Sequence, residues 1–261
     1  MSVVTPGHRP ASQSADAPGP GHAETQGAFT ERSVHVAEIW RYPVKSMAGE
    51  LCKETPVLAS GIAGDRIIQV DDGHGRLVTA RTHPGLLGHR ATLDAAGEPL
   101  VDGRPWTDPA VLAAVQRIAG PDARLVRDDD PDARFDVLPL LVATDGAVAA
   151  FGRDRRRLRP NLVIGGVNGL DERHWPGRRL RIGDAVIEVD SLRGRCVMTT
   201  FDPDSLEQDP DVLRDIVRRF GGRLALNCRV VRGGTIRAGQ EVTLGEEAGS
   251  SQLSHAGTAS I

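Results

Sequence analysis

Cys196 is the residue of this sequence best placed to do chemistry. It follows a β-strand pattern and stands directly after Arg195, whose positive charge favours the thiolate that binds metals and attacks electrophiles. Arg193 adds a second charge, and Thr199 and Thr200 offer hydroxyls to a sulfur or an oxo group. Because most free cysteines are inert core residues, simple burial is the competing interpretation.

The other two cysteines lack such a setting. Cys52 lies in a turn and Cys228 in an apolar run, and the chain has neither a Cys-x-x-Cys motif nor zinc-ligand spacing. An odd number of widely spaced cysteines argues against a disulfide framework and favours a reducing compartment. No apolar run is long enough to span a membrane and no secretory signal is visible, so we expect a cytoplasmic protein that does not span a membrane.

Two further segments place polar side chains on turns beside strands. Tyr-Pro-Val-Lys-Ser at 42–46 presents Lys45, a point charge suited to a phosphate, together with Ser46. Gly-Ile-Ala-Gly-Asp-Arg at 61–66 allows close backbone approach and ends on Arg66, where the next strand begins. Taken singly, the first segment is more often a solvated lysine after a strand, and in the second Asp65 and Arg66 could simply pair within the turn.

A third segment lies at the start of an apolar strand, where Pro160 separates Arg159 from Asn161. Such an arginine is either a fork for an anion or part of a structural salt bridge. No Ser-His-Asp order, HExxH motif or phosphate loop accompanies these groups. An anionic, phosphate-bearing cofactor whose metal takes one protein thiolate would satisfy the whole set. The net charge of −3 gives no overall attraction to nucleic acid, so we expect no nucleic-acid partner.

The elements that must position these residues are mostly short strands. Residues 180–189 and 236–244 each predict a β-hairpin, with a glycine between two apolar alternations. Helices are predicted where an aspartate and a proline precede an apolar stripe that a glycine ends, at 109–119 and 210–220, and a third begins at Asp145. Residues 1–32 and 246–261 are rich in small and polar residues and predict disordered tails.

The order of the four polar segments resembles the MOSC-domain proteins, the family of the mitochondrial amidoxime-reducing component and its bacterial relatives. The matching motifs are Tyr-Pro-Val-Lys-Ser at 42–46, Gly-Ile-Ala-Gly-Asp-Arg at 61–66, Arg-Pro-Asn-Leu-Val-Ile at 159–164 and Arg-Cys-x-x-Thr-Thr-x-Asp-Pro at 195–203. The resemblance covers most of the chain between the two tails. It implies an α+β, mainly β fold in which an N-terminal β-barrel-like domain (33–110) packs on a β-barrel MOSC domain with a few helices (111–245).

The resemblance also implies a molybdenum-molybdopterin cofactor held between the two domains. It assigns Cys196 as the catalytic residue and molybdenum ligand, and it assigns the pterin and its phosphate to Lys45, Ser46, Arg66, Thr144, Asp145, Arg159, Asn161, Arg195 and Asn227. The general properties of the family add pyridoxal phosphate binding as a further expectation.

The reaction that the resemblance implies is the reductive removal of oxygen from a small-molecule substrate, an N-hydroxylated compound. Because the chain has no plant-type ferredoxin spacing and no flavin fingerprint, we expect a separate electron-transfer protein, ferredoxin-like or cytochrome-type with a reductase. The loop at 202–207 departs from the family pattern and has no predicted role. Two alternatives stay open: a carrier that holds the cofactor or a sulfur species on Cys196, and a phosphate-binding module in which Cys196 is core packing.

Overall fold

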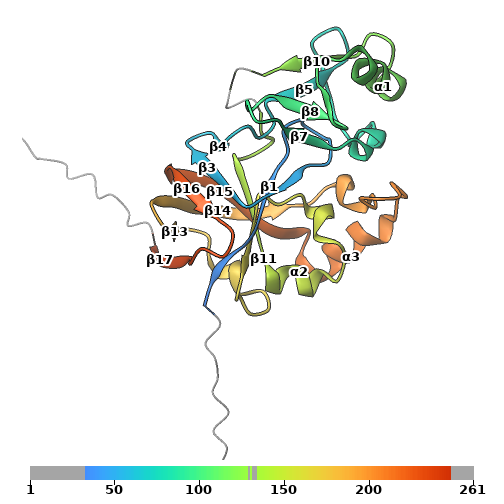
Figure 1. The fold of residues 1–261 in the computed structure, drawn as a ribbon. Helices are drawn as coiled ribbons and strands as arrows, with labels where there is room; N and C mark the ends of the chain where they lie inside the picture. Colours follow the sequence, from blue (N-terminus) through green and yellow to red (C-terminus); the bar gives the residue numbers. More distant parts are fainter. Residues whose placement is uncertain (1–32, 129, 131–133, 248–261) are drawn as a thin grey trace, which may run out of the picture. The chain divides into compact units, whose positions relative to one another are not determined.

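The structure is a computed structural model that describes residues 33–128, 130 and 134–247. The tails predicted at 1–32 and 246–261 lie outside these residues, except that 246 and 247 end a strand. The described chain is mainly β, as predicted, and combines one large sheet with three small ones and a few helices (Figure 1).

Eight strands form the large sheet, and all neighbours in it are antiparallel except β11 and β12. Its apolar side chains build the main core of the protein, which joins segments from both ends of the described chain. In order across the sheet, the strands are β17 (Thr243–Glu247), β13 (Arg178–Ile182), β14 (Ala185–Gly194), β15 (Arg223–Arg232), β11 (Leu140–Thr144), β12 (Leu162–Gly165), β1 (His35–Arg41) and β2 (Glu50–Cys52).

The hairpin predicted at 180–189 is confirmed. Strands β13 and β14 are antiparallel, and Ile182 pairs with Ala185 across a turn in which Gly183 adopts a left-handed φ of 57°. In β14 the alternating residues Ile187 and Val189 are fully buried, as a half-buried strand requires. This strand runs directly into the segment that carries the cysteine of the candidate site.

The hairpin predicted at 236–244 is wrong. Strand β16 (Gly234–Arg237) pairs with β3 (Glu54–Leu58), whereas β17 pairs with β13 in the large sheet. The chain does reverse near Gly239, which has a φ of 82°. The amide of Gly239 donates to the carbonyl of Val36, and from this reversal the chain passes from one sheet to the other. Apolar alternation predicts a strand but does not say which edge it pairs with.

Two of the three small sheets and one helix surround a second core, whereas the third small sheet adds its apolar residues to the main core. Helix α1 (Pro109–Ala119) starts as predicted, with the Asp108 carboxylate accepting from the Ala110 amide at 2.7 Å, and its Val115 is buried. The sheets are β10 (Arg124–Arg127), β5 (Ile68–Asp71) and β6 (Leu77–Val78); β16, β3 and β4 (Gly61–Ile62); and β7 (Ala91–Leu93), β8 (Pro99–Val101) and β9 (Arg104–Pro105). This core takes residues from both sides of position 110. The domain boundary near that position stays a prediction.

A third cluster joins helices α2 (Asp145–Phe151) and α3 (Pro210–Phe220), which lie side by side in Figure 1. Helix α3 was predicted from its cap and apolar stripe, and the predicted start of α2 at Asp145 is confirmed. Their contact buries large apolar side chains, each worth about 1.5–3 kcal/mol. The remaining helical turns are η1 (Pro84–Gly88), η2 (Arg155–Leu158), η3 (Asp171–His174) and η4 (Val197–Thr200). Turns η2 and η4 lead directly to the candidate site.

Candidate cofactor site

Eight of the ten residues predicted to bind a cofactor line one cavity. Its volume is about 810 Å³, part of which is open to solvent. The loops after β1, before β5, before β12 and after β14 supply most of these residues, so segments far apart in the sequence meet here. The eight are Lys45, Ser46, Arg66, Arg159, Asn161, Arg195, Cys196 and Asn227.

Three of these residues hold an unusual backbone conformation. Ser46, Arg66 and Arg159 have φ values of 72°, 53° and 55°, in the left-handed region that side chains other than glycine rarely adopt. Only six non-glycine residues in the described part of the chain share this property, and half of them line the cavity. Such strain costs about 1–3 kcal/mol per residue and gathers at functional sites, where it aims side chains that local preferences would turn away.

A buried carboxylate organises one wall of the cavity. Asp65 accepts from the amide of Tyr42 at 2.7 Å, from the side-chain amide of Asn161 at 3.1 Å, and from the guanidinium of Arg66. The side-chain oxygen of Asn161, Oδ1, accepts from the amide of Leu141 at 3.1 Å. Asn161 therefore fixes the junction of β1, β11 and β12, and most of its hydrogen-bonding capacity is used within the protein.

Arg159 and Arg195 bring buried positive charge that the protein does not fully satisfy. The guanidinium of Arg159 lies 4.3 Å from the centre of the Tyr42 ring, and its Nη2 is buried with no hydrogen-bond partner. Arg195 donates from Nη2 to the carbonyl of Leu158 at 2.7 Å, but its buried Nε has no partner. Burial lowers the pKa of each guanidinium to about 10, so both remain charged at neutral pH. Unpaired buried donors are costly, and an anion would relieve that cost.

Cys196 begins the turn η4 and is half-buried on the cavity wall. Arg81 lines the same cavity: burial would lower the pKa of Arg81, but its interaction with Cys196 and the charge of Asp136 raise that pKa. Arg193 and Arg195 also lie close enough for a thiolate to act on their pKa. The thiol therefore faces several guanidinium groups, whereas the prediction had considered only the two nearest in sequence.

The expectation that Thr199 and Thr200 would offer hydroxyls to the sulfur or to an oxo group is wrong. Thr199 donates to the carbonyl of Cys196 at 2.8 Å, and Thr200 donates to the carbonyl of Val197 at 2.6 Å. Both side chains are buried and close the turn η4. Their effect is to hold the backbone that carries the thiol.

The other cysteines differ from Cys196 as expected, although the turn predicted at Cys52 is wrong, because Cys52 is the last residue of strand β2. Cys228 is fully buried in the main core, and burial raises the pKa of its thiol. Burial also raises the pKa of the half-buried Cys52 thiol on β2. Neither lines the cavity, so Cys196 is the cysteine that a bound cofactor could reach.

Sequence reasoning missed Asp136, the single carboxylate among the described residues that line the cavity. It lies 3.4 Å from Nζ of Lys45 and 3.7 Å from Arg193, and it also pairs with Arg81. Burial favours its neutral form, but these three positive charges hold its pKa below the usual range. Asp136 and Arg81 belong to irregular segments without a motif, so the sequence carried no signal for either. The cavity brings eight cations together around this one acid: Lys45, Arg66, Arg81, Arg134, Arg157, Arg159, Arg193 and Arg195.

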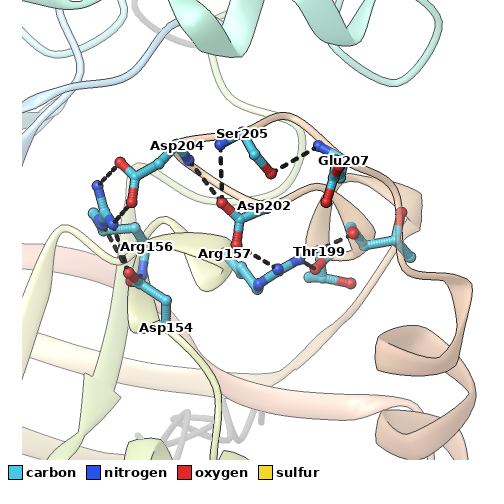
Figure 2. Close-up of polar contacts among 9 residues, drawn as sticks. Asp154, Arg156, Arg157, Thr199, Asp202, Asp204, Ser205 and Glu207 are labelled. Atoms are coloured by element: carbon cyan, nitrogen blue, oxygen red, sulfur yellow. Dashed lines mark hydrogen bonds and ion pairs between the residues drawn. The ribbon is translucent and has the colours of Figure 1, made fainter.

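Arg157 connects the turn η2 to the turn η4 and the loop that follows it (Figure 2). It lies on η2, two residues before Arg159, and its guanidinium donates to the carbonyl of Thr200 at 2.9 Å and to the carboxylate of Asp202 at 2.8 Å. The loop that follows η4 is tied to η2 a second time, through Arg156 and Asp204 at 2.6 Å. The segment that carries the thiol is thereby connected to the segment that carries a buried cation.

The predicted contacts Thr144 and Asp145 lie outside the cavity. The Thr144 hydroxyl caps α2 and donates to Glu172 at 3.1 Å, and Asp145 accepts from the amides of Gly166 and Val167 at 2.8 and 3.0 Å. These side chains hold the start of a helix against a neighbouring loop. We therefore do not carry them into the proposed binding set.

Asn227, in contrast, reaches the cavity from β15. Its carbonyl oxygen accepts from Arg193 at 3.2 Å, and its amide donates to Ser191 at 3.1 Å. It orients an arginine of the site.

Among residues 33–128, 130 and 134–247, no group of three or more His, Cys, Asp and Glu side chains could hold a metal ion. No helix in the same part of the chain is long and apolar enough to cross a membrane.

The fold and the cavity together define the class of this protein: it is mainly β and has a cavity lined by cations around one thiol. Two family models match the chain: the MOSC N-terminal beta barrel domain over residues 33–115 and the MOSC domain over residues 148–243. The chain belongs to the MOSC-domain proteins, which confirms the family predicted from the sequence motifs.

Named proteins of several organisms are similar to this chain. The human mitochondrial amidoxime-reducing component 1 is 26% identical over 227 residues, which cover 65% of this chain and 67% of that protein. A molybdenum cofactor sulfurase of Anopheles gambiae is 38% identical over 68 residues, covering 26% of this chain and 9% of the sulfurase. The solved structure of the YuaD protein from Bacillus subtilis covers 81% of this chain and 95% of its own, with 13% identity and a TM-score of 0.46.

Proposed function

We propose that the cavity binds the molybdenum-molybdopterin cofactor and that the protein reduces N-hydroxylated compounds. The observation that carries the proposal is the unsatisfied buried charge at Arg159 and Arg195, in a cavity where eight cations face one carboxylate. A phosphate-bearing anionic ligand matches this donor set, and a half-buried thiol on the same wall can ligate its metal. The name of one similar protein, a molybdenum cofactor sulfurase, points to the same cofactor, and the name of another, an amidoxime-reducing component, points to the reaction.

Each residue of the cavity has a defined part in this proposal. Cys196 ligates molybdenum, and Arg159 and Arg195 satisfy their free N–H groups on the anionic part of the cofactor. Lys45, Ser46 and Arg66 add donors from the opposite end of the sequence. Asn161 and Asn227 act mainly by holding these cations in place. When bound, the cofactor supplies two-electron redox chemistry at a single metal atom.

The net reaction needs an external reductant. Reduction of an N-hydroxyl compound to the amine consumes two electrons and two protons and releases the oxygen as water. We propose that a separate electron-transfer protein, ferredoxin-like or cytochrome-type with its reductase, delivers the electrons. Pyridoxal phosphate binding, implied by the family resemblance alone, stays a prediction.

Metal analysis of three proteins tests the proposal. Wild type, Cys196→Ala and the control Cys52→Ala are produced with cofactor supply, and bound molybdenum and pterin are quantified together with benzamidoxime reduction by a viologen donor. We expect comparable molybdenum in wild type and Cys52→Ala, with loss of molybdenum and turnover in Cys196→Ala. A wild-type protein without molybdenum, or a fully loaded and active Cys196→Ala variant, would contradict the assignment.

A second candidate function is that of a cofactor or sulfur carrier. The observation in its favour is the similarity of a 68-residue stretch to a molybdenum cofactor sulfurase. It predicts that the loaded protein transfers its cofactor to an apo-molybdoenzyme and shows no reductase turnover with any donor. Turnover of benzamidoxime at a rate that depends on Cys196 decides for the reductase.

A further inference from the structure

A second cavity adjoins the first and has a different chemical character. Its volume is about 1190 Å³, part of which is open to solvent. It shares Arg157, Arg159 and Met198 with the cation-lined cavity, so the two have a common wall. Met198 lies two residues after Cys196, which brings this second cavity next to the thiol segment.

Aromatic and aliphatic side chains make up much of its lining. Trp40 and Tyr42 stack with ring centres 6.5 Å apart and an interplanar angle of 17°, and Leu51 pairs with Trp40 across β1 and β2. Leu87 and Phe201 belong to a small apolar cluster that includes Ala80 and packs against Met198. Flat apolar walls of this kind favour a planar ring, which stacks on aromatic groups.

One positive charge of this cavity is free to meet a ligand. Arg90 is exposed, and its guanidinium has no hydrogen bond, ion pair or ring contact among the residues that the structure describes. Arg156 pairs with Asp154 and Asp204, and Arg157 pairs with Asp202. Arg159 stacks on Tyr42, and its free Nη2 is the group that the proposed function assigns to the cofactor. A ligand with an acid group would therefore find its partner at Arg90.

The loop that borders this cavity is held in place from within and from η2 (Figure 2). The carboxylate of Asp202 accepts from the amides of Asp204 and Ser205, both at 3.0 Å. Asp204 in turn makes two hydrogen bonds with Arg156, at 2.8 and 2.6 Å. This loop, which the sequence left without a role, thus carries Phe201 and Asp204 into the lining of a preformed cavity.

We propose that the second cavity is the substrate site and that it selects planar aromatic N-hydroxylated compounds that carry an acid group. The ring packs beside Trp40, the acid group pairs with Arg90, and the N-hydroxyl end points past Met198 toward the thiol segment. The proposal rests on the proposed reductase function and adds the class of substrate to it. It makes Arg90 a specificity-determining residue.

Binding of two matched probes tests the charge recognition without turnover. Affinities of 4-carboxybenzamidoxime and of neutral benzamidoxime are measured by titration calorimetry for wild type and Arg90→Gln. Loss of a partly exposed charge-assisted hydrogen bond should weaken the carboxylate probe about five- to tenfold and leave the neutral probe unchanged. Equal affinities of the two probes in wild type, or an Arg90→Gln variant that binds both as before, would overturn the role of Arg90.

A pair of exposed leucines tests the location. Leu51 lines the cavity and is 57% exposed, whereas Leu58 is 50% exposed and lies outside it, so a tryptophan at either position is compatible with folding. Leu51→Trp should weaken both probes about tenfold by narrowing the cavity, and Leu58→Trp should bind them as wild type does. Both variants should keep wild-type molybdenum content.

Different results would contradict the proposed substrate site and the proposed reductase function. Unchanged probe affinities in Leu51→Trp overturn the second cavity as the substrate site and leave the cofactor assignment intact. Absence of molybdenum from the wild-type protein overturns the reductase function, whatever the probes do.

Discussion

The guanidinium of Arg159 stacks on the ring of Tyr42, 4.3 Å from its centre, and keeps one buried nitrogen without a partner. Tyr42 is itself fixed, because its hydroxyl donates to the carbonyl of Pro160 at 3.1 Å and burial raises its pKa to about 12. The aromatic ring thus holds a charged donor ready for an anion. This arrangement favours ligand binding at the expense of stability in the empty protein.

Replacing that arginine should separate stability from binding. Arg159→Met removes an unsatisfied buried donor, so we expect the free energy of unfolding of the cofactor-free protein to stay the same or rise by about 1 kcal/mol. The molybdenum content of the same variant should fall at least about tenfold, because a charge-assisted contact is lost. Urea denaturation and metal analysis check the two halves. A variant that is both less stable and fully loaded would refute the role given to Arg159.

Asp136 should oppose the binding of anions to the empty cavity. In Asp136→Asn the charges of Lys45, Arg81 and Arg193 are no longer offset. We expect pyrophosphate to bind this variant several-fold more tightly, seen as a larger rise of Tm with pyrophosphate than in wild type. Glu241→Gln, at an exposed position outside the cavity, serves as the control and should match wild type. A smaller Tm response in Asp136→Asn would mean that this carboxylate supports the anion site.

The same carboxylate should contribute to acid sensitivity. Its folded-state pKa lies below the ordinary value of 3.8, so its stabilising contribution is complete above that value and is lost as pH falls through the folded pKa. The difference in unfolding free energy between wild type and Asp136→Asn should therefore be constant near neutrality and shrink below about pH 4. Denaturant titrations at several pH values measure it. A difference that grows as pH falls would show that this sign is wrong.

Arg157 should hold the thiol segment in position, whereas the neighbouring Arg156 should contribute little. The Arg157 side chain is 9% exposed and bonds a carbonyl and a carboxylate, so Arg157→Ala should cost about 1–3 kcal/mol of unfolding free energy. Arg156 is 37% exposed in its ion pairs, and Arg156→Ala should cost less than about 1 kcal/mol. Bound molybdenum should also dissociate faster from Arg157→Ala alone. Equal effects of the two substitutions on stability and on metal release would count against a positioning role.

Elements whose signals are local could be predicted from the sequence. Helix α3 begins where the Asp209 carboxylate accepts from the Asp211 amide at 3.0 Å, an interaction that spans two residues. The hairpin of β13 and β14 likewise forms around a short turn at Gly183. The motifs that hold Lys45 and Cys196 were visible for the same reason, because the residue types and their spacing are properties of short segments.

The pairing of strands and the composition of the cavity depended on the tertiary structure. β16 and β17 are neighbours in the sequence and their apolar residues pack into the same core, yet each strand pairs with a different distant strand. Arg81 and Asp136 have no motif, and they belong to the site because folding brings their loops to the same wall. The sequence by itself determined the family, the helices and the thiol with its nearest cations. Only the folded chain decided which charges face that thiol, since electrostatic contacts depend on distance in space rather than along the chain.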